Sequence, residues 1–220
     1  YYTVLDLTGA FFSIPIAEQS QHIFAFTWQG KQLTWTRLPQ GFTSSPTIFS
    51  QILRNDLQDL NFPRLSVLIQ YVDDLLLVIK PKENCIRDTK YLCCQLVQKG
   101  HRVSPSKLQF CQTKVKYLGF LLSPGKIEID AERVKIIQEL PRPTTKKQLR
   151  GFFGQVGFCR PWIPGFSEIA KPLHEATRNE EVKPITWGSK REKAFRTLKN
   201  ALLNAPALGL PDYSKPFKLY

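Results

Sequence analysis

The strongest constraint on the fold is the stretch LIQYVDDLLLVIK, Leu68–Lys80, which is almost wholly apolar. Two adjacent carboxylates, Asp73 and Asp74, interrupt it. Asp is common in tight turns, and a turn between two buried strands would look apolar on both sides. We therefore predict a β-hairpin with Tyr71, Val72 and the two aspartates at its tip. A hairpin tip is also a place where a rigid scaffold can present carboxylates to a metal ion.

A third carboxylate, Asp6, ends another β-branched and apolar run, YYTVLDL, near the start of the sequence. Thr8 and Gly9 follow as a small-residue turn, and two aromatic residues come next. Considered alone, an aspartate in this position is more often a cap, and a Tyr-x-Asp-Asp tetrapeptide can arise by chance. Taken together, three carboxylates on the ends of adjacent strands could hold two hard divalent cations and support phosphoryl transfer.

Two helices are expected among these strands. In TSSPTIFSQILRNDLQDL, either Ser44 or Ser45 is the N-cap and Pro46 lies in the first turn. The apolar face of this helix comprises Ile48, Phe49, Ile52, Leu53, Leu57 and Leu60. A second helix, Glu83–Lys99, ends before Gly100. Its inward face comprises Cys85, Ile86, Leu92, Cys93, Leu96 and Val97. The predicted fold class is α+β, an antiparallel sheet with helices on one face and the other face free for a ligand.

Past about Glu128 the pattern changes to short helices separated by prolines, which predicts a small helical domain. Either Thr144 or Thr145 caps one helix, and Ser189 caps another. Several aromatic residues here could stack on nucleic-acid bases, but their helical spacing favours core packing. These are Phe152, Phe153, Phe158, Trp162, Phe166 and Trp187.

Charge favours a polyanionic partner, because the chain carries 31 Lys and Arg against 18 Asp and Glu, a net charge of +13. Residues 131–220 hold 17 of the basic and 8 of the acidic residues, which favours this part as the surface that binds a nucleic-acid backbone; the alternative is a merely solvated basic face. Five cysteines without paired zinc spacing indicate free thiols, mostly buried, in a reducing compartment. No apolar run or signal sequence suggests a membrane partner, and the absence of methionine suggests a processed piece or an excised fragment.

Four segments occur in the order and spacing of a retroviral reverse transcriptase: TVLDLTGAFFSIPI, FTWQGKQLTWTRLPQGFTSSPTIF, QYVDDLLLV and VKYLGFLLSPGKIEI. QLRGFFGQVGFCRPWIPGFSEIAKPL and LLNAPALGLPDYSKPF extend the resemblance nearly from end to end. The chain most resembles the Pol polyproteins of gammaretroviruses of the murine-leukaemia type and of related endogenous retroviruses. The resemblance implies a right-hand polymerase: a palm with part of the fingers over 1–127, a helical thumb over 128–203 and the start of the connection domain over 204–220.

The resemblance implies an RNA-directed and DNA-directed DNA polymerase whose partners are an RNA template, a DNA template–primer duplex and deoxynucleoside triphosphates. Asp6 and Asp73 would bind two Mg²⁺ ions directly, with Mn²⁺ as a possible substitute, and Asp74 would complete the acidic cluster. The expected location is the virion core or the host cytoplasm. The rest of Pol would supply fingers upstream and ribonuclease H downstream, so no ribonuclease H centre is expected here. The alternatives are an inactive or truncated remnant that only binds template–primer, and an unrelated metal-dependent hydrolase.

The resemblance also assigns the surroundings of the carboxylates. Phe11 would exclude a ribose 2′-OH, with one more core Phe as the alternative. The nucleotide-binding residues would be Leu7, Gly9, Ala10, Phe11, Gln40 and Lys107. The template–primer residues would be Gly41, Tyr71, Val72, Tyr117, Leu118 and Gly119. Gly9 departs from the family, which often has an acidic residue at this position, so any buttressing by that side chain is lost.

Overall fold

In this computed structural model, the described residues are 1–62, 66–178, 184–210 and 215–216. The chain divides into two compact units, Tyr1–Leu118 and Gly119–Tyr220. The palm, thumb and connection assignments, with their boundaries at 127/128 and 203/204, stay predictions.

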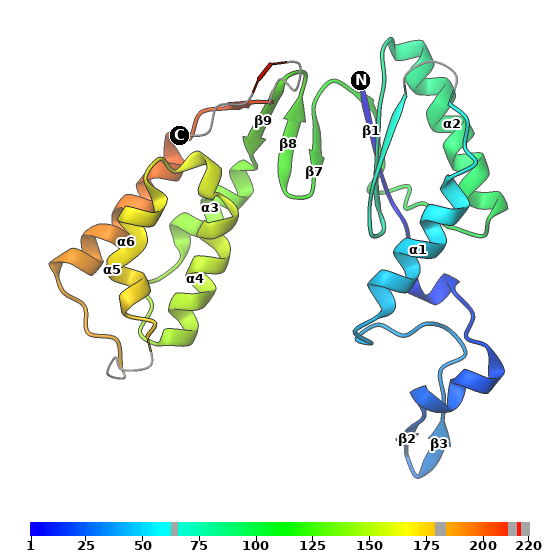
Figure 1. Ribbon diagram of the computed structural model, residues 1–220, viewed down its shortest axis with the longest axis horizontal. Helices are drawn as coiled ribbons and strands as arrows, with labels where there is room; N and C mark the ends of the chain where they lie inside the picture. Colours follow the sequence, from blue (N-terminus) through cyan, green and yellow to red (C-terminus); the bar gives the residue numbers. More distant parts are fainter. Residues whose placement is uncertain (63–65, 179–183, 211–214, 217–220) are drawn as a thin grey trace. The chain divides into compact units, whose positions relative to one another are not determined.

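A four-stranded antiparallel sheet forms the centre of the first unit (Figure 1). Its strands, in spatial order, are β4 (Val67–Tyr71), β5 (Asp74–Val78), β1 (Tyr2–Asp6) and β6 (Gln109–Gln112). Val72 and Asp73 alone join β4 to β5, and Val72 adopts a positive φ of 52°. The predicted hairpin is therefore confirmed, as is the position of Asp6 at the end of a strand.

Two helices, α1 (Ser45–Leu57) and α2 (Lys82–Gln98), pack on one face of this sheet (Figure 1). Strand residues Leu5 and Leu75 share a buried cluster with residues of both helices: Phe49, Leu53, Leu92 and Leu96. On the opposite face, alternate residues of β4 are exposed, namely Val67, Ile69 and Tyr71. The predicted α+β class, with helices on one face of an antiparallel sheet, is confirmed.

Two residues predicted to face inward are exposed instead, Ile48 at 37% and Val97 at 65%. Ile48 directly precedes the fully buried Phe49 on α1, and Val97 directly follows the fully buried Leu96 on α2. Neighbours in a helix point about 100° apart. The buried stripe is therefore narrower than the apolar pattern predicts. The N-cap of α1 is Ser44, one of the two predicted candidates.

The rest of the first unit consists of short elements. A two-stranded ribbon pairs β2 (Phe26–Trp28) with β3 (Lys31–Leu33), and β7 (Val115–Tyr117) follows β6. Two 3-10 helices, η1 (Phe11–Ser13) and η2 (Glu18–Phe24), precede the ribbon. Many apolar side chains here are exposed, including Phe12, Ile23, Phe26, Trp28, Leu33, Trp35 and Phe42.

The second unit has a small sheet and a group of helices (Figure 1). Its antiparallel strands are β8 (Phe120–Ser123), β9 (Lys126–Ile129) and β10 (Leu208–Gly209). Its helices are α3 (Ala131–Glu139), α4 (Lys146–Phe158), η3 (Arg160–Trp162), α5 (Phe166–Glu175) and α6 (Ser189–Leu203).

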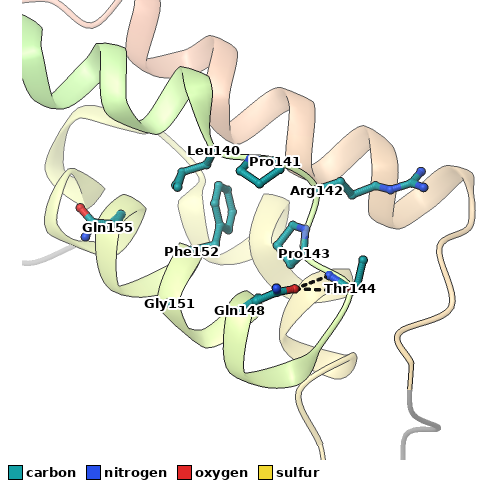
Figure 2. A pocket seen from close by; sticks show the side chains of 9 residues that line it. All are labelled: Leu140, Pro141, Arg142, Pro143, Thr144, Gln148, Gly151, Phe152 and Gln155. Atoms are coloured by element: carbon teal, nitrogen blue, oxygen red, sulfur yellow. Dashed lines mark hydrogen bonds between the residues drawn. The ribbon is translucent and has the colours of Figure 1, made fainter.

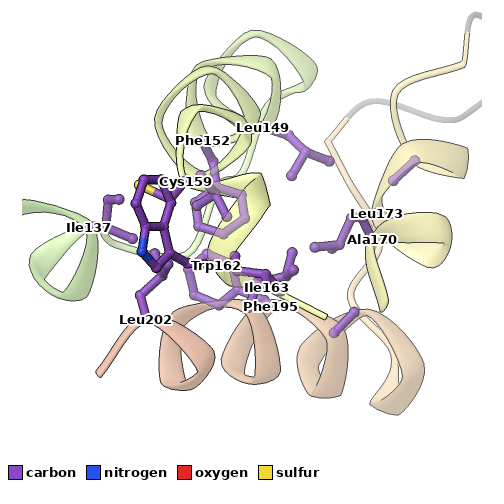
Figure 3. Packing of buried hydrophobic residues seen from close by; sticks show 14 of the residues in the cluster. Ile137, Leu149, Phe152, Cys159, Trp162, Ile163, Ala170, Leu173, Phe195 and Leu202 are labelled. Carbon is purple, nitrogen blue, oxygen red and sulfur yellow. The ribbon is translucent and has the colours of Figure 1, made fainter. Parts of the chain in front are cut away.

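One apolar cluster holds these helices together (Figure 3). Phe152 and Trp162 are buried in it, and the other four predicted aromatics are partly buried against it. The predicted core packing of these aromatics is therefore confirmed. Thr145, one of the two predicted candidates, caps α4, and it does so in a capping box with Gln148. The prediction for α6 is wrong by one residue, since Gly188 in extended conformation is its N-cap and Ser189 is already helical.

The remaining predictions concern cysteines and membranes. All five cysteines are free thiols; three are buried, Cys93 is partly buried and Cys94 is exposed. Across the described ranges, no helix combines the length and the apolar character that crossing a bilayer requires.

Candidate active site

Three carboxylates meet where β1 and the β4–β5 hairpin end. The antiparallel register places Asp6 directly opposite Asp74. The Leu7 N–H donates to the Asp73 carbonyl over 3.1 Å, which ties the end of β1 to the hairpin tip. The register follows from the buried apolar runs of the two strands, because a slip of one residue would expose them. The fold thus brings together three acids that lie far apart in the sequence.

This crowding changes the acidity of one group. Burial raises the pKa of the Asp74 carboxyl above its usual range, and the nearby charges of Asp73 and Asp6 raise it further. Lys107 acts in the opposite direction and lowers that pKa. Mutual repulsion of this kind is relieved when a cation binds among the carboxylates.

Lys107 supplies one positive charge to the cluster. Its Nζ lies 3.2 Å from Oδ1 and 3.1 Å from Oδ2 of Asp6, so it contacts both carboxylate oxygens. The Lys107 side chain is 66% exposed and that of Asp6 is 23% exposed. Exposed ion pairs of this type contribute at most about 1 kcal/mol, so an ion of higher charge can displace the ammonium. Its predicted place near a leaving pyrophosphate stays a prediction.

The carboxylates suit a hard divalent cation by their chemistry, because oxygen ligands are those that Mg²⁺ prefers. In the side-chain positions of the described ranges, however, no three Asp, Glu, His or Cys side chains form a group that could hold a metal ion. The ammonium of Lys107 lies where Asp6 would contact such an ion. Metal binding therefore requires Asp6 to exchange Lys107 for the ion.

The turn after β1 leads from the carboxylates to Phe11. Leu7 and Ala10 are buried in the cluster below the sheet, whereas Gly9 is exposed and has a positive φ of 62°. The Phe11 ring packs edge-on against Phe49, with ring centroids 5.9 Å apart. Phe11 is only partly buried, so part of its ring stays accessible. Its role as a gate for deoxynucleotides stays a prediction.

Gln40 and Gly41 lie in an exposed loop whose ends are fixed by hydrogen bonds. The Leu38 N–H donates to the Ile14 carbonyl over 3.0 Å. The buried Ser45 hydroxyl at the start of α1 donates to the Pro39 carbonyl over 2.7 Å. The loop is thus anchored on both sides of the predicted nucleotide-binding glutamine.

Tyr117, on β7, lies next to the acidic cluster. It is 7% exposed, and within the described part of the chain its hydroxyl has no hydrogen-bond partner. Burial and the nearby Asp74 and Tyr71 raise the pKa of Tyr117 to about 12, so it is a neutral phenol. Tyr71 itself is 57% exposed on the open face of the sheet, and Val72 at the tip is partly buried.

Leu118 and Gly119 follow Tyr117 with positive φ angles of 49° and 79°. A Cβ at Gly119 would lie 2.5 Å from Nη2 of Arg133, so the Arg133 guanidinium lies directly over this glycine. The turn therefore favours glycine at position 119 by both its conformation and its surroundings. Contact of this turn with a primer stays a prediction.

Two arginines near the turn were not predicted. Arg37 and Arg102 line a pocket of about 360 Å³ together with Thr8, Gly9, Phe12, Ser13 and Gly100. No sequence signal joins the two arginines, because only the bridge between Leu7 and Val103 and the fold of the loop bring them to the same turn. The lining of this pocket is positively charged, whereas the carboxylate cluster is negatively charged.

A larger pocket of about 520 Å³ lies in the second unit, between α4 and the segment that precedes it (Figure 2). It contains none of the predicted site residues. Its charged lining residue, Arg142, lies 3.6 Å from Glu192, and the Gln148 side chain already accepts hydrogen bonds from Thr144. This pocket therefore offers no acid–base pair for catalysis.

Comparison with known proteins supports one family. Residues 1–122 match the family described as reverse transcriptase (RNA-dependent DNA polymerase). The whole chain is 52% identical to part of the Pol polyprotein of Feline endogenous virus ECE1 and 50% identical to part of the Gag-Pol polyprotein of Baboon endogenous virus (strain M7). It spans only 22% and 13% of the lengths of these relatives.

Solved structures agree with the sequence comparison. The foamy viral protease-reverse transcriptase in complex with an RNA/DNA hybrid matches 93% of this chain, over 27% of its own length, with a TM-score of 0.85 and 32% identity. The same protein in complex with dsDNA matches 98% of this chain, over 44% of its own length, with a TM-score of 0.86 and 33% identity. The predicted resemblance is confirmed, and the chain belongs to the reverse transcriptase (RNA-dependent DNA polymerase) family.

Proposed function

We propose that this chain is the palm, thumb and start of the connection domain of a retrovirus-type reverse transcriptase. Its reaction would be the addition of deoxynucleotides to a primer 3′-OH on an RNA or DNA template. The observation that carries the proposal is the meeting of Asp6, Asp73 and Asp74 at one end of the sheet, in a chain of this family. Such a carboxylate cluster, with two metal ions bound, is suited to phosphoryl transfer.

Asp6 and Asp73 would hold two Mg²⁺ ions, or Mn²⁺ in their place, which when bound activate the attacking oxygen and stabilise the leaving oxygen. Asp74 adds negative charge beside them, and burial together with the charges of Asp73 and Asp6 raises its pKa. Lys107 would be released from Asp6 as the ions bind, and its ammonium would then be available to the departing pyrophosphate.

The residues around the carboxylates would bind and orient the substrates. Phe11, held against Phe49, would exclude nucleotides with a 2′-OH. Gln40 can donate and accept hydrogen bonds without adding charge near a triphosphate. Tyr71 at the end of β4 and Val72 at the hairpin tip, with the turn after Tyr117, would support the primer end.

A binding-only function is the second candidate, and two observations favour it. The Lys107 ammonium contacts both oxygens of Asp6, and Gly9 lacks the acidic side chain that many family members have at this turn. A chain that kept the family fold with this ion pair permanently closed would bind template and primer without catalysing.

Primer extension distinguishes the two. The assay uses the 220-residue chain with an RNA template, a DNA primer, Mg²⁺ and deoxynucleotides, beside the Asp73→Asn variant and a longer chain that includes the upstream fingers. Extension that falls at least about 1,000-fold in Asp73→Asn supports the polymerase. Template–primer binding without extension by either wild-type chain supports the binding-only function. Nuclease activity without extension would instead indicate a hydrolase.

The gate is tested in the same assay. Phe11→Val should raise the incorporation of ribonucleotides relative to deoxynucleotides by about tenfold or more, because the smaller side chain leaves room for the 2′-OH. Phe12→Val is the matched control, since Phe12 is 39% exposed and stacks on Trp35 instead. An equal change in both variants would remove the gate from the proposal.

A further inference from the structure

The pocket between α4 and the segment that precedes it is suited to a small ligand (Figure 2). Its volume of about 520 Å³ lies within the range of small-ligand sites. Its apolar lining residues are Leu140, Pro141, Pro143 and Phe152. The lining residues that the structure describes include no Asp or Glu. Such a lining favours an apolar molecule and does not repel a negatively charged group on it.

Hydrogen bonds fix the wall of the pocket that precedes α4. The Pro143 carbonyl accepts from Nε1 of Trp187 over 2.8 Å. The Thr144 carbonyl accepts from the N–H of Ile185 over 3.0 Å. Proline restricts φ, so the two prolines of this wall limit its conformations further. The pocket is therefore largely formed before a ligand binds, which lowers the entropic cost of binding.

The opposite wall is α4, and it is open at Gly151. A Cβ added to Gly151 would meet no other part of the chain within 4 Å. The neighbouring Phe152 is 3% exposed and belongs to the apolar cluster of the second unit. Its ring points toward the segment that precedes α4 (Figure 2). A ligand in the space beside Gly151 would therefore contact the edge of the apolar cluster.

The Gln148 side chain supplies an oriented donor. Its Oε1 accepts hydrogen bonds from the Thr144 N–H over 2.8 Å, the Thr144 hydroxyl over 2.9 Å and the Thr145 N–H over 3.2 Å. These bonds fix the orientation of the amide, so Nε2 points away from the cap. In the part of the chain that the structure describes, no protein group accepts a hydrogen bond from this Nε2. Gln148 lines the pocket, so its N–H donors are available to an acceptor on a ligand.

The charges around the pocket favour an anionic acceptor. Arg142 lines the pocket and lies 3.6 Å from Glu192. Glu192 also pairs with Arg196 at 2.7 Å, so one carboxylate is shared by two guanidinium groups. Lys147 and Arg150 are exposed on the first two turns of α4. This local excess of positive charge favours a carboxylate over an amine.

We propose that this pocket binds a small aromatic carboxylate. The flat ring would lie between the proline-containing wall and Gly151, in contact with Phe152, because aromatic rings bury a large apolar area and pack against one another. The carboxylate would accept hydrogen bonds from Nε2 of Gln148. The proposal is independent of the proposed function, since the pocket lies in the second unit and contains none of the residues assigned to polymerisation.

A ¹H–¹⁵N NMR titration of the 220-residue chain with 2-naphthoate tests the site. Saturable shifts are expected at the side-chain amide of Gln148 and at the indole N–H of Trp187, which is bonded to the pocket wall. Gly151→Leu should weaken binding by at least about tenfold, because the new side chain fills the ligand's space. The matched control is Gly154→Leu, since Gly154 lies on the same helix outside the lining and is equally open around an added Cβ.

Gln148→Glu tests the donor without removing the cap. Glutamate keeps an oxygen that accepts from Thr144 and Thr145, and it is a standard partner in a capping box. It replaces the donor with an oxygen that repels a carboxylate, so binding of 2-naphthoate should weaken by about tenfold. Lys147→Gln is the control, because it lowers the net charge by the same amount at a neighbouring exposed residue outside the lining.

Three results overturn the proposal. The first is the absence of saturable shifts in the wild-type chain. The second is an equal loss of affinity in Gly151→Leu and Gly154→Leu at unchanged melting temperature. The third is undiminished binding in Gln148→Glu. Asp73→Asn should bind 2-naphthoate as the wild type does, so a failure of the polymerase proposal leaves this result intact.

Discussion

The two units treat charge in opposite ways. The first unit crowds Asp6, Asp73 and Asp74 at the end of a sheet with Lys107 as the cation beside Asp6. The second unit pairs charges on its surface, as in the contacts of Glu192 with Arg142 and Arg196. Its buried cluster consists of apolar side chains and Cys159.

This difference indicates that the first unit carries a ligand-binding site, whereas the second unit is stabilised by apolar packing. Like charges held close together raise the free energy of the folded chain unless a ligand of opposite charge binds. Apolar packing lowers that free energy and needs no ligand. We therefore expect substitutions in the second unit to change the free energy of unfolding or the affinity for a nucleic-acid duplex. Substitutions at the carboxylates should change ligand binding.

The largest expected effect follows from opening the core of the second unit. Leu198 is fully buried on α6, so Leu198→Ala should lower the free energy of unfolding of this unit by about 2–5 kcal/mol. Chemical denaturation followed by tryptophan fluorescence measures it, because Trp162 is buried in the same cluster. Leu203→Ala on the same helix is the control, since Leu203 is 59% exposed and should change little. Equal losses in the two variants would refute the described core.

Charge reversal on the second unit should have the next largest effect. Lys147, Lys190 and Lys193 are exposed, and their combined change to Glu should weaken binding of a template–primer duplex by about tenfold or more. The slope of log affinity against log salt should also fall in magnitude by about 2–3, because fewer counterions are released. The same reversal at three exposed lysines of the first unit, Lys82, Lys90 and Lys99, is the comparison. An equal loss of duplex affinity in the first-unit variant would show that duplex binding is not concentrated in the second unit.

The smallest expected effect concerns stability at the carboxylates. Because the pKa of Asp74 is raised in the folded chain, its ionisation with rising pH destabilises the fold. Asp74→Asn cannot ionise, so at pH 7–8 it should raise the melting temperature of the first unit by about 1–3 °C. The gain should vanish below about pH 4, where an ordinary carboxyl becomes protonated. A melting temperature of Asp74→Asn below that of the wild type at pH 7–8 would contradict the claim that the charge of Asp74 destabilises the folded chain.

Sequence patterns predicted the packed elements better than the site. The hairpin around Asp73, the helices of both units and the buried aromatics follow from local periodicity, which the structure obeys. The pairing register of β1 and β5 places Asp6 opposite Asp74. The buried apolar runs of the two strands imply that register. The contact between Lys107 and Asp6 and the pocket of Arg37 and Arg102 depend on tertiary proximity that no local pattern encodes. Family resemblance was needed to predict Gln40, Phe11 and the turn after Tyr117.

The apolar pattern wrongly predicted the burial of two helix residues, because the buried stripes of α1 and α2 are narrower than their apolar patterns. Ile48 and Val97 are as apolar as their buried neighbours, yet the helix turns them toward solvent. The cap of α6 was misplaced because Ser189 and Gly188 both suit an N-cap, and only the backbone angles distinguish them.

The most direct test of the account is a count of bound metal ions. Mn²⁺ titration followed by electron paramagnetic resonance, with template–primer and a non-extending nucleotide present, measures them. Two ions are expected in the wild-type chain, and binding should be at least about tenfold weaker in Asp6→Asn and Asp73→Asn than in the exposed control Asp59→Asn. Undiminished Mn²⁺ binding in Asp6→Asn and Asp73→Asn would contradict the claim that these crowded carboxylates form a metal site.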